Sequence, residues 1–178
     1  MTKTLILLRH AKTETGSPGQ DDRDRHLTAR GQKATQIVGN HLRASGIRPD
    51  ITLCSTAVRT TETWFGIEQV YRDTLPISYS DKLYLATAGE ILSVIAGLAT
   101  DTVQQLMVVA HNPGIHELAM KLAHQGDEEL IERMAIKFPT CASAIFRCHT
   151  PDWQVLSHAR CELVDFKSPR MLGQEIRD

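Results

Sequence analysis

Three apolar runs in this chain are each followed by side chains that are rare in a protein core and useful in chemistry. Arg9 and His10 follow the first run, Arg59 lies just beyond the second, and His111 follows the third. An arginine guanidinium is a planar fork of N–H donors that matches the oxygens of a phosphoryl group. A neutral imidazole nitrogen is a competent nucleophile. If the fold brings these four residues together, they could bind a phosphoryl group and accept it on a histidine.

His10 is the expected nucleophile. The positive charges of Arg9 and Arg59 disfavour protonation of a nearby imidazole, which keeps its nitrogen lone pair free. In the loose transition state of phosphoryl transfer, Arg9, Arg59 and His111 would hold the equatorial oxygens. Because these fixed cations take the electrostatic role of a metal, we expect no metal and no cofactor. The histidines of the chain also lack the spacing of metal ligands.

Short apolar strands must position these groups. Residues 3–8 and 105–110 are continuously apolar at their centres, as strands are when a parallel sheet buries both of their faces. Shorter strands are predicted at 50–54 and 77–80. In open sheets of this kind, ligands bind beyond the carboxyl ends of the strands. The four candidate residues are therefore expected to meet at one edge of the sheet.

Four helices are predicted between and after these strands from their N-terminal signals, which are Ser or Thr caps, a capping box and a proline. The predicted N-terminal residues are Thr28, Ser55, Thr87 and Pro113. The first helix should end near Ala44 and the second near Tyr71. Strands alternating with helices predict an α/β fold, a three-layer α/β/α sandwich with a mostly parallel sheet.

The last third of the chain changes character. Residues 142–148 and 154–158 look like strands separated by a turn at Thr150-Pro151-Asp152, and 160–166 would continue the second strand. This pattern predicts an antiparallel hairpin added to the parallel sheet. We expect one domain over 1–178, with 166–178 as a loosely held polar tail.

Composition limits the classes of protein that fit. A formal net charge of -1 argues against a nucleic-acid binder that relies on bulk positive charge. The N-terminal apolar run is too short for a signal peptide, and none approaches the roughly 20 residues of a membrane span. We therefore expect a soluble, cytoplasmic protein, a monomer that binds neither nucleic acid nor membrane. The four cysteines form no CxxC pair and are expected to be reduced core thiols.

Three segments resemble the motifs of a known family. Residues 8–11, Leu-Arg-His-Ala, resemble an Arg-His-Gly signature, and 55–63 resemble a Ser-x-x-x-Arg-x-x-x-Thr motif. Residues 109–114, Val-Ala-His-Asn-Pro-Gly, resemble a second histidine motif. In order and spacing the chain is similar to the histidine phosphatase, or phosphoglycerate mutase-like, superfamily. Ala11 and Ala110 replace two glycines of the usual pattern.

Finer features resemble the SixA-like branch, the phosphohistidine phosphatases. These are residues 24–31, which resemble an Arg-Pro-Leu-Thr-x-x-Gly segment with His26 in place of proline, residues 83–90, and His-Asn-Pro-Gly at 111–114. The resemblance implies an enzyme that removes phosphate from a histidine-phosphorylated protein through a covalent phospho-His10 intermediate. It also implies that Arg25 is a further arginine of the phosphate pocket, although Arg23 lies only two residues earlier.

Three further residues are candidates for the phosphate pocket. Ser55 stands at the start of a helix whose N–H groups could face a phosphate. Lys12 could equally be a solvated loop residue, and Asn112 could only cap the helix that follows it.

A general acid is not evident in the sequence. Mutases and acid phosphatases of the superfamily carry a carboxylate that protonates the leaving oxygen. Asp81 and Glu90 lie in the right part of the chain, but Glu90 is more simply a capping residue. Imidazole, whose pKa is about 6.5, leaves more readily than an alkoxide. The missing acid thus favours a phosphoramidate substrate over a mutase reaction. A small-molecule phosphomonoesterase and a non-catalytic phosphate- or phosphoprotein-binding module remain as alternatives.

Overall fold

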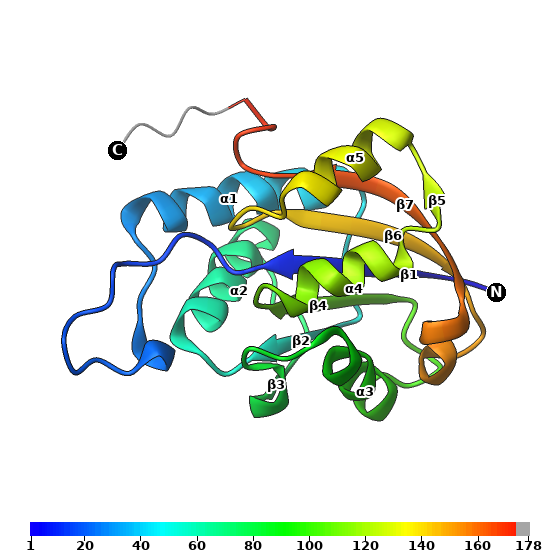
Figure 1. The fold of residues 1–178 in the computed structure, drawn as a ribbon, viewed down its shortest axis with the longest axis horizontal. Helices are drawn as coiled ribbons and strands as arrows, with labels where there is room; N and C mark the ends of the chain where they lie inside the picture. Colours follow the sequence, from blue (N-terminus) through cyan, green and yellow to red (C-terminus); the bar gives the residue numbers. More distant parts are fainter. Residues whose placement is uncertain (174–178) are drawn as a thin grey trace.

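One mixed sheet organises residues 1–173, which are the residues that the computed structural model of this protein describes (Figure 1). Within them, seven strands lie in the order β3-β2-β4-β1-β6-β7-β5. The strands are β1 (Thr2–Arg9), β2 (Ile51–Ser55), β3 (Ile77–Ser80), β4 (Gln105–Ala110), β5 (Gln125–Gly126), β6 (Ser143–His149) and β7 (Arg160–Lys167). Strands β1 to β4 are mutually parallel, and β6 runs antiparallel to both β1 and β7.

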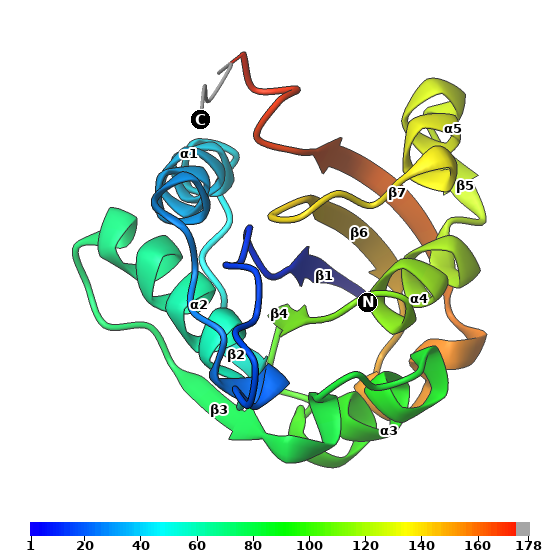
Figure 2. The same ribbon diagram turned by 60° about the vertical axis from the view of Figure 1, so that its left-hand side comes forward.

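Helices cover both faces of the sheet, as Figure 2 shows. One face carries α1 (Ala29–Ala44) and α2 (Val58–Tyr71), and the other carries α3 (Ala88–Leu98), α4 (Gly114–Leu122) and α5 (Glu128–Ile136). The predicted three-layer α/β/α sandwich with a mostly parallel sheet and an antiparallel C-terminal addition is confirmed.

The position of β1 in the sheet explains why its central residues, 5–8, are all apolar. Leu5 and Leu7 pack into the core under α3, α4 and α5, whereas Ile6 and Leu8 pack into the core under α1 and α2. Successive side chains of a strand point to opposite faces, so the middle of a strand with both faces covered has apolar residues at consecutive positions. All four side chains are fully buried.

Local capping signals predicted two helix starts correctly. The Thr28 hydroxyl accepts a hydrogen bond from the Gly31 N–H at 3.0 Å, and Thr87 forms a capping box with Glu90. The helix predicted at Pro113 also begins there, with that proline as the N-cap of α4. The prediction that Ser55 caps α2 was wrong, because Ser55 is the last residue of β2 and Ala57 is the N-cap.

The C-terminal third differs from its prediction in three places. Trp153–His158, predicted to contain a strand, is a 3₁₀ helix that buries Trp153 and Leu156 at its helical spacing of three residues. Helix α5 and the two-residue strand β5 were not predicted. Phe166 and Lys167 belong to β7 and not to a loose tail, and the rest of that tail beyond residue 173 lies outside the described residues.

The four cysteines are buried and unbridged, in agreement with the expectation of reduced core thiols. Cys148 and Cys161 face each other across β6 and β7, with their sulfur atoms 2.8 Å apart. Among the described helices, none has the length and apolar character needed to cross a membrane.

Candidate active site

The two histidines meet where β1 and β4 end. These strands are parallel neighbours, and Arg9 is paired with Ala110 in their register, so the residues that follow leave the sheet side by side. The His10 N–H donates to the Ala110 carbonyl at 3.1 Å. The imidazole rings of His10 and His111 lie with their centroids 5.3 Å apart. The convergence predicted from the strand pattern is present.

A backbone carbonyl fixes the tautomer of His10. The Nδ1 atom lies 2.8 Å from the carbonyl oxygen of Ala11, which can only accept a hydrogen bond. Nδ1 therefore carries the proton, and the lone pair is on Nε2. The Ala11 N–H donates in turn to the Thr63 hydroxyl at 2.9 Å, which holds this piece of backbone against α2.

The His10 ring is also kept uncharged. Burial is the main cause that lowers its pKa to about 4, and the charges of Arg9, Arg59 and Arg25 lower it further. At neutral pH the imidazole is thus neutral, with Nε2 available as a nucleophile.

His111 is held through Ser55. Its Nε2 atom lies 2.8 Å from the Ser55 hydroxyl, and that oxygen accepts from the Ala57 N–H at 3.5 Å. The Ser55 hydroxyl can in turn donate its proton to Nε2, and in that tautomer the ring proton of His111 is on Nδ1. Burial, followed by the proximity of His10 and Arg59, lowers the pKa of His111 to about 3, so this ring is neutral as well.

Arg9 and Arg59 approach the rings from β1 and α2. Arg9 donates to the Phe138 carbonyl at 2.9 Å, and Arg59, in the first turn of α2, has a side chain only 2% exposed. Burial lowers the pKa of Arg9. The Nε atoms of both arginines are buried without a partner.

Unpaired buried atoms gather at this place. Seven buried side-chain N or O atoms of the described chain lack a hydrogen-bond partner, and four of them belong to Arg9, Arg59, His111 and Asn112. Buried polar groups are nearly always paired, so such a cluster calls for an explanation. Three of the four atoms are nitrogens that can donate, and a ligand rich in acceptor oxygens would satisfy them together.

The loop between β1 and α1 completes the site from beyond the carboxyl end of β1 (Figure 1). It contains a short 3₁₀ helix, Asp22–Asp24, and its Arg25 acts electrostatically on His10. Arg23 pairs with Asp81 at 3.1 Å and lies over the ring of Tyr84, and it is not among the charges that lower the pKa of His10. Arg25 rather than Arg23 is therefore the loop arginine at the pocket.

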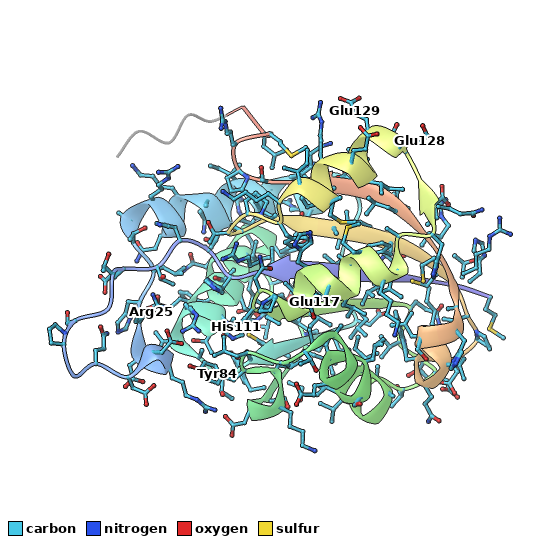
Figure 3. All side chains as sticks on the ribbon, viewed as in Figure 1. Arg25, Tyr84, His111, Glu117, Glu128 and Glu129 are labelled. Carbon is cyan, nitrogen blue, oxygen red and sulfur yellow. The ribbon has the colours of Figure 1, made fainter. Side chains whose placement is uncertain are left out.

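Two residues of the site were not singled out from the sequence. The Asp22 carboxylate bonds to Arg59 at 2.8 Å, to Arg25 at 2.7 Å and to the Tyr84 hydroxyl at 2.6 Å. Tyr84 meets His111 edge to ring, with centroids 5.5 Å apart. Figure 3 shows Arg25, Tyr84 and His111 in this part of the molecule. Tyr84 lies in a segment that carried a family resemblance, whereas nothing in the polar loop sequence marks Asp22.

The remaining candidates occupy other positions. Ser55 is engaged with His111, and Asn112 donates to the Phe138 carbonyl at 3.1 Å while its Oδ1 atom stays unpaired. Lys12 is exposed, and its backbone carbonyl accepts a hydrogen bond from the Thr28 N–H at 3.0 Å. The structure thus brings Ser55 and Asn112 to the site, whereas Lys12 is exposed and bonds to Thr28 through its backbone carbonyl.

Neither candidate general acid has the properties of a proton donor. Hydrogen bonds from Thr56 and Arg23 lower the pKa of Asp81, whose side chain is 73% exposed. Bonds from the Thr87 N–H and hydroxyl lower the pKa of Glu90, which caps α3. Both carboxyl groups are ionised at neutral pH.

Two glycines of the motifs mark places where backbones touch. A Cβ atom at Gly114 would lie 1.8 Å from the carbonyl oxygen of Ala86, and one at Gly31 would lie 2.2 Å from that of Lys12. Each contact brings together two segments that flank the pocket, so the glycines serve its shape and not its chemistry.

Comparison with known proteins agrees with this geometry. Residues 5–91 match the model of the histidine phosphatase superfamily (branch 1). An uncharacterized protein of Mycobacterium tuberculosis is 35% identical over 167 residues, which cover 92% of this chain and all of the relative. The chain belongs to the histidine phosphatase superfamily.

Similar solved structures identify the branch of the superfamily to which this chain belongs. A candidate phosphohistidine phosphatase SixA from Agrobacterium tumefaciens is 30% identical, with a TM-score of 0.79 over 94% of this chain and 98% of the other. A second such candidate, from Nakamurella multipartitia, is 26% identical, with a TM-score of 0.83 over 95% and 97% of the two chains. Within the superfamily, this protein is a member of the SixA-like branch. Membership of this family supports the assignment of the protein as a phosphatase.

Proposed function

We propose that this protein is a metal-independent phosphohistidine phosphatase that removes phosphate from a histidine-phosphorylated protein through a covalent intermediate on His10. The observation that carries the proposal is the hydrogen bond from His10 Nδ1 to the Ala11 carbonyl, which leaves Nε2 unprotonated beside the unpaired nitrogens of Arg9, Arg59 and His111. A nucleophile and a set of donors for a phosphoryl group thus lie in one buried place.

The first half-reaction follows from this arrangement. The Nε2 lone pair of His10 attacks phosphorus as the bond from phosphorus to the substrate imidazole breaks. The substrate ring carries a proton on its other nitrogen, so it takes the electron pair of that bond and leaves as neutral imidazole. Arg9, Arg59 and the Nδ1–H of His111 hold the equatorial oxygens, where negative charge is spread in the transition state. These fixed donors do the work that a metal ion does in other phosphoryl-transfer enzymes.

The second half-reaction returns the enzyme to its starting state. Water attacks phospho-His10, the bond from phosphorus to Nε2 breaks, and its electron pair returns to the ring nitrogen. The proton lost by the water passes to the phosphate product or to solvent. The bond to Ala11 keeps the ring in one tautomer through both steps.

The carboxylates around the pocket favour a phosphoramidate over an ester. Asp22 has its pKa lowered to about 2, with the Tyr84 hydrogen bond as the largest cause, and the pKa values of Asp81 and Glu90 are lowered too. None is protonated at neutral pH. General acid catalysis is worth roughly 10²–10⁴-fold to a strongly basic leaving group, and an imidazole needs it least. The candidate phosphohistidine phosphatases among the similar structures support the same substrate class.

A substrate panel tests the proposal. A histidine-phosphorylated protein domain, free phosphohistidine, phosphoserine and an aryl phosphate would be compared by kcat/KM at pH 7.5, with and without a chelator. We expect the phosphohistidine protein to be the best substrate by at least about tenfold and the chelator to have no effect. A preference for phosphoserine would contradict the substrate assignment, and loss of activity with the chelator would contradict the metal-independent mechanism.

A further inference from the structure

The Asp22 carboxylate occupies arginine donors that a phosphoryl group would use, and the Tyr84 hydroxyl helps to hold it there. Its Oδ2 atom accepts from Arg59 Nη2 at 2.8 Å and from the Tyr84 hydroxyl at 2.6 Å. Its Oδ1 atom accepts from Arg25 Nε at 3.0 Å, and Arg25 Nη2 lies 2.7 Å away. The Asp22 backbone carbonyl takes the remaining terminal nitrogen of Arg59, Nη1, at 2.6 Å. One residue thus engages both terminal nitrogens of a pocket arginine.

A carboxylate and a phosphoryl group are anions of similar geometry that prefer the same bidentate donors. Both cannot keep the full set of bonds from Arg59 and Arg25 at once, and two anions side by side repel each other. Bound phosphate must therefore take donors from Asp22 or bind against its charge.

The burial of the two partners indicates which of them moves. The Arg59 side chain is 2% exposed and lies in the first turn of α2, so its position is fixed by packing. The Asp22 side chain is 44% exposed. Asp22 is the first residue of a three-residue 3₁₀ helix within a long loop. Surface loops shift at a lower free-energy cost than packed helices.

We propose that Asp22 is an internal anion that competes with phosphate: it holds Arg59 and Arg25 in the empty pocket, gives them up to the incoming phosphoryl group and regains them when free phosphate leaves. Asp22 thereby lowers the affinity of the pocket for its own inorganic product. This inference rests on the phosphate pocket of the proposed function, but it does not depend on which leaving group the substrate carries.

Binding of inorganic phosphate tests the inference without turnover. The dissociation constant would be measured by calorimetry at pH 7.5 and constant ionic strength for the wild type, Asp22→Asn and Asp24→Asn. We expect Asp22→Asn to bind phosphate about tenfold more tightly, because a competing negative charge is removed. Asp24→Asn removes the same charge from the same turn, but its exposed side chain forms no bond to these arginines, so its affinity should match the wild type.

A second variant keeps the test independent of local damage. Tyr84→Phe removes one donor from Asp22 and leaves every charge in place, so it should loosen the carboxylate and tighten phosphate binding by about twofold to threefold. Thermal melting of all three variants would show that the fold persists.

The outcomes separate the inference from the proposed function. Unchanged or weaker phosphate binding by Asp22→Asn would overturn the inference, and weaker binding would show instead that Asp22 orients the arginines. Tighter binding together with no hydrolysis of phosphohistidine by any form would uphold the inference while contradicting the proposed function. Hydrolysis of phosphohistidine with no gain in phosphate affinity for Asp22→Asn would support the proposed function and contradict the inference about Asp22.

Discussion

The imidazole Nδ1 of His10 donates a hydrogen bond to the backbone carbonyl oxygen of the next residue, Ala11, at 2.8 Å. This contact decides the chemistry of the ring, because it places the proton on Nδ1 and the lone pair on Nε2. The carbonyl is itself held in place, since the Ala11 N–H donates to Thr63 on α2. The backbone after β1 and the first turns of α2 together orient the nucleophile.

Replacement of Arg59 by lysine should reduce kcat/KM by about 10²–10³-fold, the usual effect of losing one preorganised donor at a developing negative charge. A lysine keeps the charge but loses the planar fork, so the loss measures geometry and not charge. Steady-state kinetics with the phosphohistidine protein would provide the value. Arg170→Lys, at an exposed position of the C-terminal segment, should retain full activity. Comparable rates for Arg59→Lys and wild type would contradict the role of the guanidinium.

The pH dependence of the free energy of unfolding should show that His10 is buried as a neutral ring. His10 has a folded-state pKa of about 4, below its ordinary value of 6.5. Between these pH values the unfolded chain binds a proton that the folded chain does not, so stability falls as the pH is lowered through this window. The contribution of His10 to this fall is about 2 kcal/mol between pH 7.5 and pH 5.

Urea unfolding at the two pH values measures this contribution. The drop in free energy of unfolding from pH 7.5 to pH 5 should be smaller by about 2 kcal/mol in His10→Asn than in wild type. His149→Asn, at an exposed position that ends β6, should show the wild-type drop. An equal drop in all three proteins would mean that His10 titrates normally in the folded state.

Gly114→Ala should destabilise the protein by about 1–3 kcal/mol, as inserting a methyl group into a packed site usually does. The new Cβ atom would lie 1.8 Å from the Ala86 carbonyl oxygen, so α4 or the segment before α3 must shift. Gly97→Ala is the matched control, because it lies within α3 and its Cβ atom would have no neighbour within 4 Å. That substitution should stabilise the protein by up to about 1 kcal/mol. Equal melting temperatures for the two variants would contradict the close approach.

The sequence predicted the parts of the site that follow from regular structure. His10 and His111 were expected to meet because each follows an apolar strand, and parallel strands end at a common edge. Thr28 and Thr87 were expected to cap helices because capping depends on residues three positions apart. These inferences needed only local patterns and one rule of topology.

The sequence could not predict contacts between irregular segments. Asp22 and Arg59 are 37 residues apart, and the loop that carries Asp22 has no periodicity from which to infer its path. Ser55 was expected to cap α2, but the strand extends through it and its hydroxyl is used by His111. Such contacts depend on tertiary packing, which no pattern along the chain encodes.

Covalent trapping on His10 tests the central claim most directly. The protein would be exposed for milliseconds to seconds to a domain carrying ³²P-phosphohistidine, quenched in alkali and digested, and the labelled peptide would be sequenced by mass spectrometry. We predict an acid-labile label on His10 that appears before free phosphate, is chased by unlabelled substrate and is absent from His10→Asn but present in His149→Asn. Release of phosphate at the wild-type rate by His10→Asn, or a label on any residue other than His10, would contradict the account.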